Sequence, residues 1–249
     1  HAMSRRQRQM CIRDRANTAT GKTTAAGGAT VFTLSNVTAF NGGTASDFAT
    51  LLTSETNGLI SGGITTQALT VDGTIGVSAA NDLNTTTTGV VTATITEGDM
   101  TTLADLADKE SGQSTDNAYT VTITDTSVAA GALNTLAGKT SVAVTGSSIT
   151  TLTGTISDVN TAYANTSGIT GLGNEAVTIS DTDNSSNGVS IADLNTLDDY
   201  TTGTIDAATI TVATGTLAAL LEAYGSNGIT GLGNEMIILT DSEVSVTDL

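Results

Sequence analysis

The chain of 249 residues has no proline or tryptophan, one cysteine and one histidine. The histidine, the cysteine and five of the eight basic residues all lie within the first 15 positions. From residue 16 onward the sequence contains no arginine, histidine or cysteine, which excludes disulfide bonds there. It also leaves serine and threonine hydroxyls without an imidazole or thiol partner that could take part in nucleophilic catalysis. We therefore expect a protein that is not an enzyme.

Positive charge is also scarce. Residues 16–249 hold three lysines against 24 acidic residues, all but Asp14 of the 25 in the chain, which gives a net charge of −21. Because nucleic-acid phosphates need basic partners, we expect no nucleic-acid binding. No apolar run approaches the roughly 20 residues that cross a bilayer, so we expect no membrane insertion. The acidic surplus is interpreted as a solvated, self-repelling surface.

The first residues differ from the rest of the chain. His1-Ala2-Met3 resembles a cloning remnant, and residues 10–15 resemble the translated end of a transposase-based sequencing adapter. We set residues 1–15 aside as an artefact of this kind. Residues 16–28 show no periodicity and are predicted to be a flexible lead-in. The remaining segment, residues 29–249, is treated as the repeat region.

An exact internal repeat organises that region. The segment Gly-Ile-Thr-Gly-Leu-Gly-Asn-Glu occurs at Gly168–Glu175 and again, 60 residues later, at Gly228–Glu235. A short helical pattern precedes each copy and a β-like run follows it. Self-similarity at a fixed period is typical of repeat architectures, in which each unit buries its apolar face against its neighbours.

Two kinds of coil alternate in the sequence. The Gly-Thr coil has a β run, a Gly-Thr step and an amphipathic helix, and it occurs at 29–59, 90–116, 142–174 and 204–234. The Asp-Leu-Asn coil is marked by a Val-Ser-x-Ala-Asp-Leu-Asn signature or a variant of it, at 77–84, 128–134 and 189–195. The chain ends inside another such signature, at 244–249, so we expect the array to be truncated at its C-terminus.

Local patterns predict one strand and one helix for each coil. Thr-x-Thr runs alternate with period two, as half-buried strands do. One predicted helix face comprises Leu217, Leu220, Leu221 and Tyr224. The N-cap candidates are Thr44 or Ser46 and Thr155 or Ser157.

The spacing of these elements predicts the fold class. Parallel strands repeat at about 4.8 Å, whereas packed helices need about 8–10 Å. We therefore expect an α/β fold, a right-handed solenoid of about seven to eight β-strand/helix coils whose curvature is like that of leucine-rich repeats.

Three phrases of the repeat region, at 125–136, 149–155 and 168–181, resemble repeats of very large secreted or cell-surface proteins of marine bacteria, notably cyanobacteria. The resemblance covers most of residues 29–249. It implies an extracellular or cell-surface location and a structural or adhesive role, and it transfers no catalytic residue. Two alternatives stay open, namely a calcium-dependent surface-layer or toxin-stalk module and an ice-binding solenoid whose Thr-x-Thr strands form a ladder.

Calcium is the one cofactor that the sequence brings into consideration. The loop at 181–188 gathers oxygen ligands, and the candidate ligands are Asp181, Asp183 and, from the next coil, Asp241. Turns closed by aspartate and asparagine side chains explain the same residues without an ion. The partners we expect are neighbouring repeats of the same chain, with end-to-end self-association through open apolar coil faces.

Overall fold

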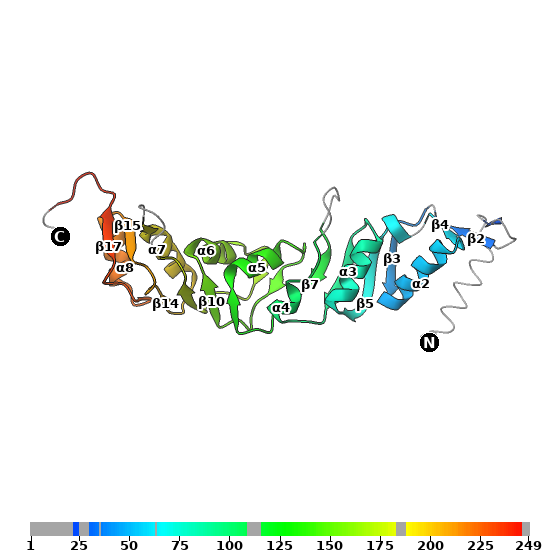
Figure 1. Cartoon of the computed structure of the whole chain (residues 1–249), viewed down its shortest axis with the longest axis horizontal. Coiled ribbons are helices and arrows are strands. Elements are labelled where there is room, and N and C mark those ends of the chain that lie inside the picture. The colour runs from blue at the N-terminus through cyan, green and yellow to red at the C-terminus, as the bar shows by residue number, and fades with distance from the viewer. Residues whose placement is uncertain are drawn as a thin grey trace. The chain divides into compact units, whose positions relative to one another are not determined.

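The computed structural model describes residues 22–24, 30–34, 36–62, 64–108, 116–182 and 188–245 (Figure 1). The fold is mixed α/β, with several sheets of parallel strands and seven α-helices in the described residues. The chain divides into two compact units. Unit 1 comprises residues 1–94 and 109–117, and unit 2 comprises 95–108 and 118–249.

Unit 1 contains two small sheets. Its elements are β1 (Lys22–Thr24), β2 (Thr30–Thr33), β3 (Ala39–Gly43), α2 (Ala45–Thr56), β4 (Ile60–Ser61), the 3-10 helix η1 (Ile64–Thr66), β5 (Ala68–Ile75), α3 (Val77–Thr86) and most of β6 (Val91–Ile95). One sheet has the order β1-β2-β4, and β3, β5 and β6 are neighbours in the other. Strand β1 lies in the segment predicted to be a flexible lead-in. It pairs antiparallel with β2, because pairing satisfies the backbone groups of both strands.

Unit 2 is built mainly of short parallel strands and four longer helices. Its elements are α4 (Met100–Leu103), β7 (Ala118–Thr120), β8 (Ser127–Ala129), α5 (Ala130–Ala137), β9 (Val144–Thr145), β10 (Thr151–Gly154), α6 (Ile156–Ala164), β11 (Ile169–Thr170), β12 (Ala176–Ile179), β13 (Val189–Ser190), α7 (Ile191–Tyr200), β14 (Ile205–Asp206), β15 (Val212–Gly215), α8 (Leu217–Gly225), β16 (Ile229–Thr230) and β17 (Met236–Leu239). The largest sheet has the order β8-β10-β12-β14-β16, and another has the order β13-β15-β17.

The helices of unit 2 follow one another in space as they do in sequence. Helix α6 packs on α5 and α7, and α8 packs on α7 (Figure 1). The four helices begin at residues 130, 156, 191 and 217, so successive starts are 26, 35 and 26 residues apart. This alternation fits two kinds of coil. The prediction of one strand for each helix is wrong, since three strands separate α6 from α7. The glycines at 171 and 173 have φ of 85° and 139°, and such turns break an extended run into short strands.

The core of unit 2 explains how so few aromatic residues suffice. One aliphatic residue from each strand of the largest sheet lies beside its neighbour in register, and all five are buried: Val128, Leu152, Val177, Ile205 and Ile229. Strands buried in this way carry branched aliphatic residues, which pack well across a parallel sheet. A narrow core of this kind is filled by aliphatic side chains and needs no large aromatic residues.

The predicted N-caps are confirmed at the threonine of each pair. The hydroxyls of Thr44 and Thr155 accept the amides of Asp47 and Asp158, three residues into α2 and α6. The predicted apolar face of α8 is only partly buried. Leu220 is 5% exposed, whereas Leu221 is 58% and Tyr224 is 44% exposed.

None of the described helices could span a bilayer. The longest of them, α2, has 12 residues, and about 20 apolar residues are needed.

Candidate functional site

The conspicuous polar contacts of unit 2 connect one coil to the next, and the first kind is made by aspartates. In each case a carboxylate Oδ2 accepts, at 2.7 Å, the backbone amide of the first residue of a helix 24 or 25 positions earlier. The three contacts are Asp125 with Met100, Asp181 with Ile156, and Asp241 with Leu217. An N-terminal amide of a helix has no partner within the helix, and a negative charge there also complements the helix dipole. Each helix is thus capped by the following coil.

The second kind of contact is made by asparagines at the fifth position of a helix. Each Nδ2 donates, at 2.9 Å, to the backbone carbonyl of the third residue of the next helix. The three contacts are Asn134 with Asp158, Asn160 with Asp193, and Asn195 with Ala219. A carbonyl oxygen has two lone pairs and can accept this bond together with its helical one. The asparagine ladder therefore sets the register between α5, α6, α7 and α8.

A threonine after the helix of the Asp-Leu-Asn coil makes the third kind of contact. The hydroxyl of Thr201 donates to the carbonyl of Glu175 at 2.8 Å and accepts the amide of Gly203 at 3.0 Å. In unit 1 the Thr87 hydroxyl likewise donates to the carbonyl of Gln67 and accepts the amide of Gly89. Both threonines are buried, and the backbone groups that they bond are buried or part-buried. We call this arrangement the threonine staple.

The repeated eight-residue segment ends in a glutamate that closes its own turn. In the first copy, Glu175 Oε2 accepts the amides of Gly173 and Asn174 and the hydroxyl of Tyr163 at 2.8–3.1 Å. Glu175 is fully buried, and its Oε1 has no hydrogen-bond partner among the described residues. In the second copy the carboxylate of Glu235 accepts the Tyr224 hydroxyl and the corresponding amides.

The environment of Tyr163 stabilises its neutral phenol. Burial raises the pKa of Tyr163 above its ordinary value, and the hydrogen bond and negative charge of Glu175 raise it further. The ring of Tyr200, from the next coil, stacks on Tyr163 with 5.7 Å between ring centroids. A glutamate beside a tyrosine is a pair used in acid–base chemistry. Here, however, the carboxylate is sealed from solvent, so the pair joins the turn to the helix.

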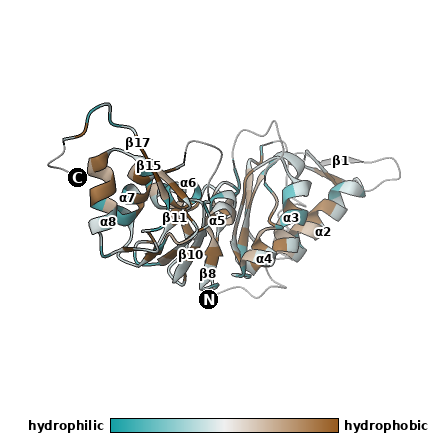
Figure 2. Cartoon of the chain, turned by 60° about the vertical axis from the view of Figure 1, so that its left-hand side comes forward, coloured by the Kyte–Doolittle hydropathy of each residue, from teal (hydrophilic) through white to brown (hydrophobic). Residues whose placement is uncertain are grey.

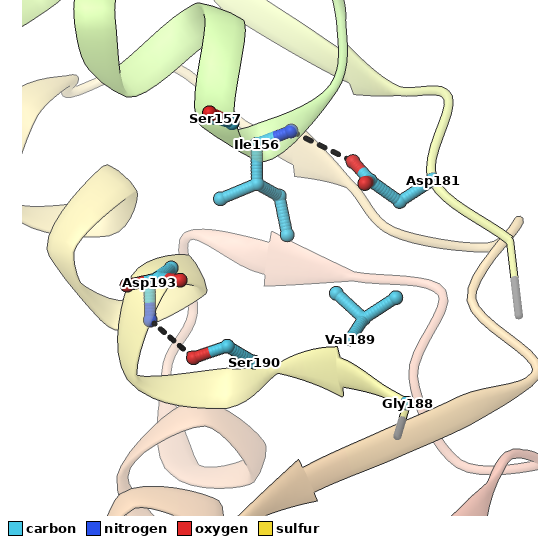
Figure 3. Close-up of a pocket in the computed structure, with 7 residues that line it drawn as sticks. All are labelled: Ile156, Ser157, Asp181, Gly188, Val189, Ser190 and Asp193. Atoms are coloured by element: carbon cyan, nitrogen blue, oxygen red, sulfur yellow. Dashed lines mark hydrogen bonds between the residues drawn. The ribbon is translucent and has the colours of Figure 1, made fainter. Parts of the chain in front are cut away.

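Two shallow hollows lie near these contacts. The first has a volume of about 160 Å³ and is lined by residues that include Ile156, Asp181 and Asp193 (Figure 3). The Asp181 carboxylate points towards the Ile156 amide, and Asp193 lies on the other side of the hollow (Figure 3). The second, of about 360 Å³, is lined by Tyr200 and by residues between 162 and 172 of the preceding coil, among them Tyr163. In the first hollow the Asp181 carboxylate accepts the Ile156 amide and the Ser190 hydroxyl oxygen accepts the Asp193 amide.

The structure gives two of the three calcium candidates another role. Asp181 and Asp241 cap α6 and α8, and α7 packs between these two helices. Asp183 lies outside the described residues. Among the residues that are described, no group of three or more histidine, cysteine, aspartate or glutamate side chains is placed to hold a metal ion. The capping roles were not foreseen, although the recurrence of an aspartate after a β run at 125, 181 and 241 was a usable signal.

The Thr-x-Thr pairs at 92–94 and at 209–211 lie in different local structures. Thr92 and Thr94 lie in β6 with exposed side chains. Thr209 and Thr211 precede β15 instead, and the Thr209 hydroxyl donates to the carbonyls of Ile179 and Asp181. The Thr209 hydroxyl is thus hydrogen-bonded to the backbone of the preceding coil, although the residue itself is exposed.

In the comparison with known proteins, no family model, no curated protein and no solved structure matches this chain.

Proposed function

We propose that this chain is a non-catalytic structural segment of a large secreted or cell-surface repeat protein, in which it acts as a spacer or adhesive scaffold. The observation that carries the proposal is the use of polar side chains in unit 2. Aspartate caps, the asparagine ladder and threonine staples all join a coil to its neighbour. Enzyme sites, by contrast, collect polar groups around a pocket.

The finer fold proposal is that the coils form an α/β solenoid. Parallel strands in register, helices packed in chain order and the 26- and 35-residue alternation support it. In such a protein each unit contacts only its neighbours, and stability is the sum of unit and interface contributions. The resemblance of the repeat phrases to giant proteins of marine bacteria supports the extracellular or cell-surface location.

Pulling the chain by its two ends tests the spacer role. If coils separate one after another, the extension grows in steps of about 90 Å and about 120 Å, since an extended chain spans roughly 3.4 Å per residue and the coils have 26 or 35 residues. The coils that have not yet unfolded would then keep their structure while the chain lengthens under force. Loss of all of unit 2 in a single event at low force would contradict the proposal.

A further inference from the structure

We propose that the face of unit 2 formed by α8, the turn at 228–235 and β17 binds one further Asp-Leu-Asn coil, with its strand parallel to β17. This inference rests on the proposed repeat array and specifies the chemistry of the next member. We call this surface the terminal face.

Apolar side chains are exposed on the terminal face. The exposed fractions are 58% for Leu221, 44% for Tyr224, 39% for Ile237 and 40% for Leu239. In Figure 2 hydrophobic residues colour both α8 and β17. The counterparts of Tyr224, Ile237 and Leu239 in the preceding copy are Tyr163, Val177 and Ile179. These three residues are at most 7% exposed. Scattered exposed apolar residues are ordinary, but a contiguous set marks an interaction surface.

The earlier copy shows what covers these positions. The coil of α7 and β14 lies on them, with Ile205 paired in register with Val177. The amide of Val177 donates to the carbonyl of Thr204 at 2.9 Å, and the amide of Thr202 donates to the carbonyl of Gly173 at 3.0 Å. The threonine staple of Thr201 completes the contact. The covering coil is thus recognised through backbone groups as well as through apolar area.

The turn of the terminal face presents the same backbone groups in the same order, whereas Leu221 of α8 stands where α6 has Asn160. Residues 228–235 are identical to 168–175, so the carbonyls of Gly233 and Glu235 correspond to those of Gly173 and Glu175. Strands β16 and β17 are each the last strand of their sheet among the described residues. Their outer edges therefore offer backbone donors and acceptors to a parallel strand, as in recognition by strand addition.

A glycine in the covering coil makes the fit selective. A Cβ added at Gly203 would lie 2.1 Å from the Glu175 carbonyl oxygen, closer than any real contact. In unit 1 a Cβ at Gly89 would lie 2.3 Å from the Gln67 carbonyl oxygen. Each glycine follows a threonine staple in the sequence Thr-Thr-Gly, at 87–89 and 201–203. A partner coil with the geometry of residues 201–203 therefore carries glycine at the third position, whereas the coil with Thr140-Ser141-Val142 makes the same two threonine contacts with valine there.

A second copy of the folded chain is a poorer occupant. The coil that fits, that of α7, already packs between α6 and α8 of its own chain. A second copy would have to unfold locally to release it. We therefore assign the terminal face to a further Asp-Leu-Asn coil. The sequence Val244-Ser-Val-Thr-Asp-Leu249 matches the start of this coil at residues 189–194.

The experiment lengthens the full chain after Leu249 with a copy of residues 195–210, which completes a coil of the required kind. Amide hydrogen exchange then reports on Ile237, the counterpart of Val177. We expect at least tenfold slower exchange of the Ile237 amide than in the unextended chain. The matched control carries valine in place of the copied Gly203, and we expect it to leave Ile237 exchange unchanged.

Equal protection by the two extensions, or protection by neither, would overturn the proposal. Sedimentation of the unextended chain provides the competing outcome. A dimer in which Ile237 is protected would assign the terminal face to a second copy and would also overturn it. Failure of docking is distinguishable from failure of the spacer role, because stepwise extension under force depends on the coils already present.

Discussion

The Asp181 carboxylate accepts the backbone amide of Ile156, the first residue of α6, although 25 residues separate them in sequence. The donor belongs to one coil and the acceptor to the next. A short helix is marginal on its own and depends on packing and capping. Helix α6 therefore owes part of its stability to a residue that comes later in the chain.

Replacement of Asp181 by alanine should destabilise unit 2. We expect a loss of about 1 kcal/mol, the usual effect of removing an N-terminal cap, and a fall in Tm of about 2–4 °C. Thermal unfolding monitored by circular dichroism measures it. Asp199→Ala, at an exposed position of α7, is the matched control and should change stability by less than about 0.5 kcal/mol. Equal effects of the two substitutions would refute the capping role.

The threonine staple predicts that substitutions of the adjacent residues Thr201 and Thr202 differ in their effect on stability. Thr201→Val keeps the shape of the side chain but leaves the part-buried Gly203 amide and the buried Glu175 carbonyl without the hydroxyl, so we expect a loss of about 1–3 kcal/mol in the free energy of unfolding. Thr202 has an exposed side chain whose single contact is at 3.5 Å. Thr202→Val should therefore be nearly neutral. Denaturant midpoints at constant m-value distinguish the two, and similar losses would argue against the staple.

The asparagine ladder predicts which of two substitutions at Asn160 destabilises the protein more. Asn160→Ala removes the bond to the Asp193 carbonyl and should cost about 1 kcal/mol. Asn160→Asp places a carboxylate against that carbonyl with no donor, so it should cost at least about 2 kcal/mol. Urea unfolding of both variants measures the order. An aspartate variant as stable as the alanine variant would show that Asn160 does not face the carbonyl in solution.

The buried phenol of Tyr163 predicts a loss of stability in alkali. Because burial and Glu175 raise the pKa of Tyr163 in the folded state, its neutral form is favoured there. This contribution is fully present below the ordinary phenol pKa of about 10 and is lost as the pH rises through the folded-state pKa. Tyr163→Phe should remove that alkaline loss. Unfolding midpoints between pH 8 and pH 11 test it, with Tyr200→Phe as the control, which should keep the loss.

Calcium should leave the stability of the chain unchanged if the aspartates serve as caps. One oxygen of Asp181 and one of Asp241 are already engaged by helix amides. We expect no rise in Tm with millimolar calcium. A rise that Asp183→Ala abolishes, while Asp199→Ala leaves it intact, would favour the calcium-dependent alternative. A ligand that binds only the folded state raises Tm increasingly as its free concentration exceeds Kd, so a calcium titration of Tm reports binding directly.

The sequence predicted features that depend on neighbouring residues. Thr44 and Thr155 cap their helices because each cap and its amide are three residues apart, well within a local pattern. The same reasoning failed for Leu221 and Tyr224, whose helical spacing indicates one face but not what covers it. The number of strands was also missed, because positive-φ glycines divide what reads as one run.

The contacts between coils could not be predicted from local sequence patterns. Asp181 and Ile156, or Asn160 and Asp193, are separated by 25 and 33 residues, and no spacing rule pairs them. The Asp-Leu-Asn signature nevertheless marked Asn134 and Asn195, but not Asn160, and the exact repeat marked Glu175. What the sequence lacked was the identity of the partner, which only the register between coils determines.

The links described in unit 2 each connect a coil to the one beside it. Asp181, Asn160 and Thr201 reach across one boundary, over 25, 33 and 26 residues. Recombination within the gene could therefore add or delete a whole 60-residue period without breaking the pairing of any surviving link. An array built in this way can change its length during evolution while every junction stays the same.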